Sequence, residues 1–151
     1  MTVYLTADTH FGHTNIIKYC GRPFNTVEEM NEALISNWNK VIKVDDIVIF
    51  LGDLGFKSNI DIWLTKLNGD KLLIWGNHDK TGKPDTRFEY KSEIFLLTHK
   101  MIPIIDRNIW NIHGHSHDKG MLVDKKNKSM CVSTELTGYT PICMDKLLSM
   151  R

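Results

Sequence analysis

Histidine, aspartate and asparagine recur in this 151-residue chain directly after short apolar segments. Imidazole, carboxylate and amide oxygen together are ligands that suit Mn, Fe or Zn better than Ca or Cu(I). The pattern therefore predicts a site for transition-metal ions. Its members fall at five places along the chain: Asp8 with His10, Asp53, Asn77 with His78, His99, and His115 with His117.

These groups are too many for one ion, since a catalytic zinc usually takes three protein ligands. They suit two ions that share a carboxylate. Two ions about 3.5–4 Å apart can activate a water and hold the oxygens of a phosphoryl group during in-line displacement. The residues alone thus predict a two-metal hydrolase, for which we favour Mn, with Fe, Zn or Ni as alternatives.

Short strands are expected to position these groups. Ligands bind at the carboxyl ends of strands in open α/β sheets, and neighbouring strand ends lie about 4.8 Å apart. Side chains from several strand ends should therefore converge at one edge of a sheet. The expected strands, each ending at one of the polar groups, are residues 3–7, 47–51, 71–75, 94–97 and 109–112.

Helices are predicted between and after the strands. Residues 26–40 begin with a capping box of Thr26 and Glu29 and carry apolar residues at a spacing of three to four. A second helix is expected to begin at Ser58, and a closing helix at Thr140, with Pro141 in its first position. Residues 80–87 are expected to be a loop, and residues 130–132 a strand after a turn at 125–128. This order predicts an α/β sandwich built on a mixed sheet.

Length and composition set broader bounds. The length predicts a single domain spanning residues 1–151. A balance of 19 Lys+Arg against 18 Asp+Glu disfavours a general nucleic-acid binder. No apolar run approaches the ~18 residues of a membrane span, and the first residues do not resemble a signal peptide. Three cysteines without metal-type spacing fit a reducing cytoplasm, where we expect the protein to act.

Taken in order, the five places resemble the sequence blocks of the calcineurin-like metallophosphoesterase superfamily. The match runs from residue 3 to about residue 143, and residues 11–24 further resemble small bacterial and phage members without a cap domain. The resemblance implies a metallophosphoesterase-type αββα sandwich with mixed β-sheets and a metal site at the carboxyl ends of strands. The blocks are Asp8-x-His10, Gly52-Asp53, Gly76-Asn77-His78-Asp79, His99 and Gly114-His115-x-His117.

The resemblance also implies a role for each matching residue. His78 would donate to the phosphate oxygen or to the leaving group, and Asp79 would fix its orientation; such acid–base help is worth ~10²–10⁴ in rate. Asp53 would bridge the two metals and so take part in catalysis. One metal would be held by Asp8, His10 and His117, and the other by Asn77, His99 and His115.

Substrate contacts are expected from Asn77, His13 and Arg22. Arginine suits bidentate phosphate recognition, although Arg22-Pro23 could equally form a structural turn before the helix. His13 stands close in sequence to the first pair of ligands.

The predicted function is metal-dependent hydrolysis of a small phosphoester by a metal-activated water. Ser/Thr phosphoprotein phosphatases carry an Asp-Arg-Gly element after the second block, and the arginine is absent from Gly52-Asp53-Leu54-Gly55. About 20 residues between His78 and His99 leave no room for a cap domain. The resulting open cleft favours a phosphodiester or nucleotide-like substrate. The alternatives are a nuclease on the same site and a non-catalytic binding scaffold of the same fold.

Overall fold

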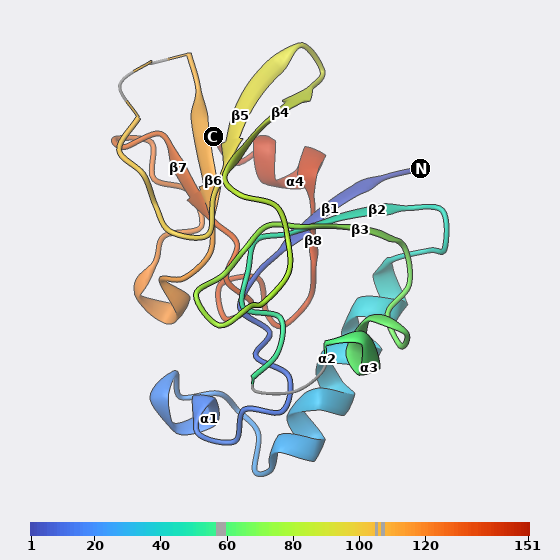
Figure 1. Ribbon diagram of the computed structural model, residues 1–151. Helices are drawn as coiled ribbons and strands as arrows, with labels where there is room; N and C mark the ends of the chain where they lie inside the picture. The colour runs from blue at the N-terminus through green and yellow to red at the C-terminus, as the bar shows by residue number, and fades with distance from the viewer. Residues whose placement is uncertain (57–59, 105, 107) are drawn as a thin grey trace.

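Two four-stranded mixed sheets form the centre of the computed structural model, which describes residues 1–56, 60–104, 106 and 108–151 (Figure 1). The first sheet has the order β3-β2-β1-β8, with β8 antiparallel to β1 and the other pairs parallel. Its strands are β1 (Val3–Thr6), β2 (Ile47–Phe50), β3 (Asp70–Leu73) and β8 (Ile142–Cys143).

The second sheet has the order β4-β5-β6-β7, with β4 antiparallel to β5 and the remaining pairs parallel. Both sheets are therefore mixed, which confirms the predicted α/β class. Its strands are β4 (Thr86–Tyr90), β5 (Glu93–Leu97), β6 (Trp110–His113) and β7 (Ser129–Cys131).

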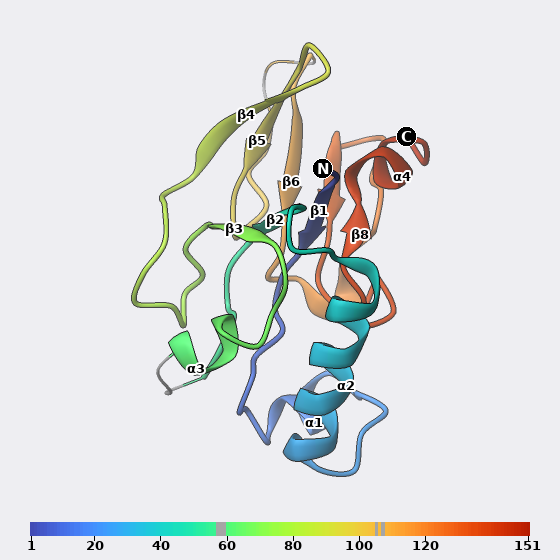
Figure 2. The ribbon, with the colours of Figure 1, turned by 90° about the vertical axis from the view of Figure 1, so that its right-hand side faces the viewer.

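Three helices lie on the outer side of the first sheet: α1 (Ile16–Tyr19), α2 (Val27–Val41) and α3 (Asp61–Leu64). Helices α2 and α3 pack against it, and α1 lies beside the lower end of α2 (Figure 2). The apolar stripe of α2 includes Leu34 and Trp38, which lie in one buried cluster with Phe50 of β2. The Thr26 hydroxyl accepts the Glu29 N–H at 3.1 Å, as the predicted capping box requires. The Glu29 carboxylate accepts the N–H of Asn25, one residue before the expected Thr26 N–H. No described helix is long and apolar enough to cross a membrane.

The core between the sheets is built from alternate residues of both sheets, because successive side chains of a strand point to opposite faces. Leu5 and Ile49 belong to the first sheet, and Phe95, Leu97 and Ile112 belong to the second; all are fully buried. The last helix, α4 (Met144–Leu148), adds the fully buried side chains of Met144 and Leu147 to this core. The other face of the second sheet carries loops, and no α-helix among the described residues packs there.

Several elements differ from the sequence-based expectations. Residues 142–143 pair with β1 as β8, so the closing helix begins at Met144 and not at Pro141. Residues 86–90 form β4 because they pair with β5 in a hairpin, although residues 86 and 87 were expected to end a loop and residues 88–90 had no predicted element. The second helix is only α3, and its expected cap, Ser58, lies outside the described residues.

Candidate metal centre

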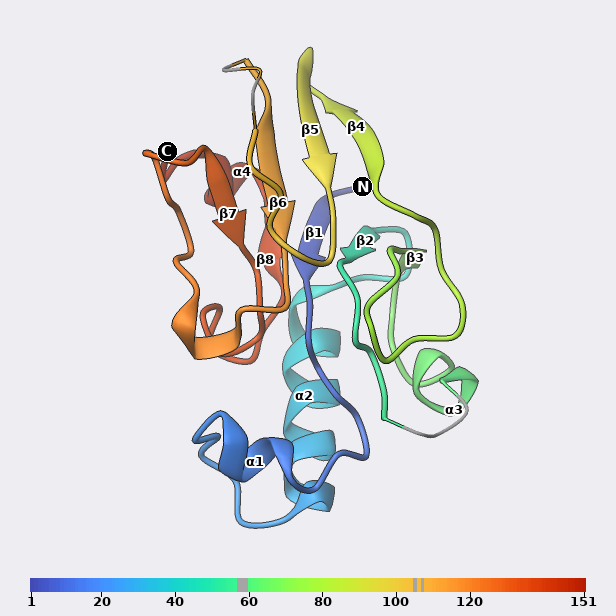
Figure 3. The same ribbon diagram turned by 60° about the vertical axis from the view of Figure 1, so that its left-hand side comes forward.

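The loops that follow the carboxyl ends of the parallel strands come together at one end of the two sheets (Figure 3), and they carry the polar groups. The loops after β1 and β2 run side by side: the Asp8 N–H donates to the Gly52 carbonyl at 2.9 Å, and the His10 N–H to the Asp53 carbonyl at 3.0 Å. The Gly114 N–H donates to the His99 carbonyl at 3.0 Å, which joins the ends of β5 and β6. These backbone bonds fix the loops from which the ligand candidates project.

One group of ligand atoms comes from Asp8, His10 and His117, and these atoms all lie within 4.8 Å of one another. Asp8 Oδ2 accepts from Ser133 Oγ at 2.6 Å and from the His115 N–H at 2.8 Å. Asp8 Oδ1 and both ring nitrogens of His10 are buried without a hydrogen-bond partner among the described residues. Such buried polar atoms are costly when left alone, and a bound cation would satisfy Asp8 Oδ1 and one of the two His10 nitrogens.

A second group comes from Asp53, His99 and His115, again with atoms within 4.8 Å. His99 Nδ1 donates to the Leu51 carbonyl at 2.8 Å, so Nε2 is the ring nitrogen left to bind a cation, which would replace the proton that Nε2 shares with Asp53. That Nε2 lies 3.0 Å from Asn77 Oδ1 and 3.1 Å from His115 Nδ1. Three ligand-type atoms from different loops thus face one another.

Asp53 belongs to the second group and also approaches His10 of the first. Its Oδ1 accepts the His78 N–H at 2.9 Å, and its Oδ2 lies 3.6 Å from His10 Nε2 and 3.3 Å from His99 Nε2. Burial opposes its negative charge, but the hydrogen bonds from His99 and the His78 N–H outweigh burial and lower the pKa of Asp53 to about 2. An ionised carboxylate oxygen therefore faces both groups.

In the group of Asp8, His10 and His117, burial shifts the pKa values of two ligand candidates strongly. Burial raises the pKa of Asp8 to about 6 and lowers the pKa of His10 to about 3. A neutral imidazole and a carboxylate that burial has deprived of solvation are both suited to bind a cation, because metal ligands must be deprotonated.

The backbone of five ligand candidates lies in the left-handed region. Asp and His adopt it more readily than most residues, yet it remains uncommon and carries strain that tends to collect at functional sites. The φ angles are 59° at Asp8, 51° at His10, 60° at Asp53, 66° at His115 and 48° at His117.

Gly52 allows the close approach of these loops. Its φ is +93°, and a Cβ at this position would collide with His99 Nδ1 and with the Gly76 backbone. A side chain there would displace a ligand candidate, which explains why this turn needs glycine.

The structure adds Glu135, which sequence reasoning missed. Its Oε1 accepts from His117 Nδ1 at 3.0 Å and from Arg22 Nε and Nη2 at 2.9 and 2.7 Å. Burial opposes ionisation, but His117 and Arg22 outweigh it and lower the pKa of Glu135 to about 2. Ser133 and Glu135 follow β7 as the other polar groups follow their strands, so the strand-end pattern contained a signal for both.

Arg22 does not face the cleft, contrary to its expected contact with substrate. Its side chain is 0% exposed, and its Nη1 and Nη2 donate to the carbonyls of Thr9 and Asp8 at 2.8 and 2.7 Å. With Glu135 it braces the loop that carries two ligand candidates, which agrees with the structural alternative.

The other predicted residues surround the centre. Asn77 and His78 are exposed at its mouth, and the His78 ring lies 5.4 Å from the His10 ring. His13 is buried 5.6 Å from His10, ring to ring, and its Nδ1 accepts the Ile16 N–H.

Asp79 has a different role from the one expected. Its carboxylate accepts the N–H groups of Asp53, Leu54 and Gly76, at 2.7, 3.1 and 2.9 Å. It therefore holds the loops after β2 and β3 together, and no described hydrogen bond joins it to the His78 ring.

This sequence is similar to proteins of Methanocaldococcus jannaschii and of Mycobacterium phage L5. The chain is 44% identical over 158 residues to the uncharacterized protein MJ1445 of Methanocaldococcus jannaschii, covering 98% of this chain and 90% of that protein. It is 35% identical over 81 residues to the Gene 66 protein of Mycobacterium phage L5, covering 50% of this chain and 39% of that protein.

Two solved structures share the fold. The protein AQ665 from Aquifex aeolicus has a TM-score of 0.76 at 24% identity, covering 99% of both chains. A Vps29 single mutant from Entamoeba histolytica has a TM-score of 0.50 at 18% identity, covering 87% of this chain and 73% of that one.

The family model described as calcineurin-like phosphoesterase matches residues 1–147. This match spans all the strand-end ligand candidates and agrees with the two mixed sheets. The chain belongs to the calcineurin-like phosphoesterase family.

Proposed function

We propose that this protein is a dinuclear, metal-dependent phosphoesterase that prefers a phosphodiester or nucleotide-like substrate. The observation that carries the proposal is the position of Asp53. Its Oδ2 lies within 3.6 Å of His10 and 3.3 Å of His99, one from each ligand group, so a single oxygen is placed to contact two ions.

The donor set fits two divalent transition-metal ions. The buried atoms of Asp8 and His10 that lack partners support one site, and the tautomer set at His99 by the Leu51 carbonyl supports the other. Two such ions supply an activated water and neutralise phosphate charge when bound. We assign Asp8, His10 and His117 to one ion, Asn77, His99 and His115 to the other, and Asp53 to both. Mn is the proposed metal, with Fe, Zn or Ni as alternatives.

His78 is proposed as the acid that protonates the leaving group. The Asp53 carboxylate accepts its backbone N–H, while its ring is exposed beside the His10 ring at the mouth of the centre. This position lets the imidazole reach a bound ester from the solvent side. Asn77 and His13 are proposed to lie against the phosphate from the same loops that carry the ligands.

The preference for a diester rests on the openness of the centre. Asn77, His78 and His115 are all exposed, and a short loop and the β4–β5 hairpin separate the third block from His99. An open site can admit the substituents on both sides of a diester phosphate. A small monoester has only one such substituent and gains little from the open site.

The test is hydrolysis of bis-p-nitrophenyl phosphate against p-nitrophenyl phosphate, with Mn²⁺ or with EDTA, for the wild type and Asp53→Asn. We expect Mn²⁺-dependent cleavage that favours the diester and falls at least ~100-fold in the variant, more than the 10–100-fold typical of residues outside the ligand set. Circular dichroism checks that the variant is folded. Activity that survives EDTA or the substitution would refute the two-metal proposal, and a preference for the monoester would refute the diester preference.

A further inference from the structure

A cavity of about 490 Å³ adjoins the candidate metal centre between α1 and the 3-10 helix η1 (His117–Lys119). In Figures 1 and 3, α1 lies opposite the orange turn that contains η1. One wall carries Ile16, Tyr19 and Cys20, and the other consists of residues 115–119, which include two ligand candidates. The volume is in the range of small-molecule sites, about 300–1,000 Å³.

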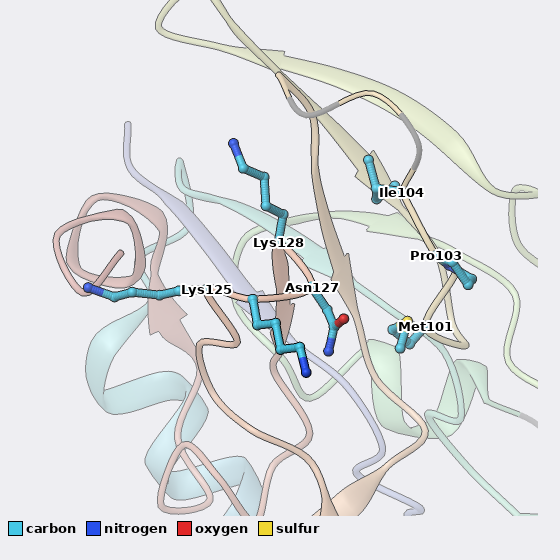
Figure 4. A pocket seen from close by; sticks show the side chains of 7 residues that line it. Met101, Pro103, Ile104, Lys125, Asn127 and Lys128 are labelled. Atoms are coloured by element: carbon cyan, nitrogen blue, oxygen red, sulfur yellow. The ribbon is translucent and has the colours of Figure 1, made fainter.

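Three other cavities lined by described residues contain no ligand candidate of the centre. The one in Figure 4 lies between the loop after β5 and the turn before β7, and Lys125 and Lys128 extend from its rim. No metal-ligand candidate lines it. A substrate with its phosphate at the metals would therefore extend into the α1–η1 cavity, which shares His115 and His117 with the centre.

Tyr19 gives this cavity a flat aromatic wall. The residue is 71% exposed, which is unusually open for a large aromatic residue. The Tyr19 ring meets the His13 ring edge-on, with 6.2 Å between the ring centroids. The His13 ring in turn packs on Phe56, with centroids 3.9 Å apart. Tyr19 therefore has an aromatic neighbour at one edge, while most of its surface is open to a ligand.

The remaining lining narrows the class of ligand. Ile16 supplies an apolar surface beside Tyr19, while Ser116, Asp118 and Lys119 supply hydrogen-bonding groups on the opposite wall. An alkyl chain would leave these polar groups unpaired, and a sugar alone would leave the ring uncovered. A flat heterocycle with polar edges matches both walls, since every nucleobase has a π-face that can stack on an aromatic side chain.

We propose that the α1–η1 cavity binds the nucleoside part of the substrate, with the base stacked on Tyr19 and the phosphate at the metal centre. This inference rests on the proposed phosphoesterase function and names its substrate class, a nucleoside phosphoester. Tyr19 is then a specificity-determining residue, and it takes no part in the chemical step.

The test measures binding of AMP and of ribose 5-phosphate to the Mn²⁺-loaded protein by isothermal titration calorimetry. The two probes differ in the base, so the ratio of their dissociation constants isolates its contribution. The variants are Tyr19→Phe, which keeps the flat ring, Tyr19→Leu, which keeps apolar bulk without it, and Tyr19→Ala.

Stacking on one aromatic ring corresponds to roughly 5- to 150-fold in affinity. We therefore expect AMP to bind at least fivefold more tightly than ribose 5-phosphate to the wild type and to Tyr19→Phe. The preference should fall to about one in Tyr19→Leu and Tyr19→Ala, with ribose 5-phosphate binding unchanged.

Equal binding of the two probes to the wild type, or a preference that survives in Tyr19→Ala, would overturn the inference. A preference retained fully by Tyr19→Leu would overturn the stacking role. Hydrolysis of bis-p-nitrophenyl phosphate separates this failure from that of the proposed function. If Mn²⁺-dependent cleavage persists without a base preference, only the nucleoside pocket is wrong, whereas loss of cleavage itself would remove the phosphoesterase proposal.

Discussion

At the scale of single residues, the centre depends on groups that orient the ligand candidates. The Leu51 carbonyl fixes the tautomer of His99, Ser133 occupies one oxygen of Asp8, and Glu135 contacts Nδ1 of His117. These contacts leave Nε2 of both histidines and Oδ1 of Asp8 available to a cation. Such outer contacts set ligand geometry and typically change metal affinity or activity 10–100-fold when lost.

Replacing the proposed acid should separate chemistry from metal binding. His78→Ala keeps every assigned ligand, so we expect two metals per chain but a kcat that is lower by ~10²-fold or more, in line with general acid catalysis. Steady-state kinetics with bis-p-nitrophenyl phosphate, together with metal analysis of the same sample, provide the measurement. Unchanged turnover would remove His78 from the mechanism.

Neutralising the Glu135 carboxylate, which holds His117, should weaken metal binding at one of the two sites. Glu135→Gln keeps the shape of the side chain but loses the charge that holds His117 and Arg22, so we expect Mn²⁺ affinity at one of two sites to fall about 10–100-fold. Calorimetric titration resolves the two binding events. Glu93→Gln, which alters an exposed ion pair with Arg151, serves as the control and should leave both events unchanged. Equal behaviour of the two variants would contradict the positioning role.

At the scale of elements, the sequence allowed the strands to be predicted more accurately than their surroundings. Apolar runs that stop at Asp8, Asp53 and His99 are local signals, and the structure has strands there. Arg22 and Glu135 lie 113 residues apart in the chain, so no local pattern could show that they pair. The strand β8 was missed because its two residues are extended only through pairing with β1. Considered without that pairing, Pro141 indicated the start of a helix.

Asp46 shows how one side chain ties elements of the first sheet together. Its carboxylate accepts the N–H of Thr2 just before β1, at 2.7 Å, and the N–H of Lys43 after α2, at 3.0 Å. These hydrogen bonds, that of Lys43 first, lower the pKa of Asp46 below its ordinary value of 3.8. A carboxylate with a lower pKa in the folded state stabilises the protein above its unfolded-state pKa and loses this contribution as the pH falls.

We therefore expect Asp46→Asn to lower the melting temperature at pH 7, because the amide cannot accept both N–H groups through its nitrogen. The difference from the wild type should shrink as the pH falls below about 4, where the wild-type carboxylate itself becomes protonated. Thermal denaturation at several pH values measures it, with the neighbouring exposed Asp45→Asn as the matched control. A difference that does not depend on pH would argue against a role for the charge.

At the scale of the whole molecule, two mixed sheets bring ligand candidates from both to one open edge. β1, β2 and β3 supply Asp8, His10, Asp53 and Asn77, whereas β5 and β6 supply the remaining histidines. Neither sheet alone contains the complete set, so the packing of the sheets creates the centre. The covering helices lie on the first sheet alone among the described residues, and the centre stays accessible.

The most direct test of this account is anomalous diffraction from crystals of the protein grown with Mn²⁺. The account predicts two manganese peaks about 3.5–4 Å apart, the spacing of two-metal sites, with Asp53 between them. Asp8, His10 and His117 should surround one peak, and Asn77, His99 and His115 the other. A single peak, or two peaks that do not share Asp53, would contradict the two-metal assignment on which the proposed function depends.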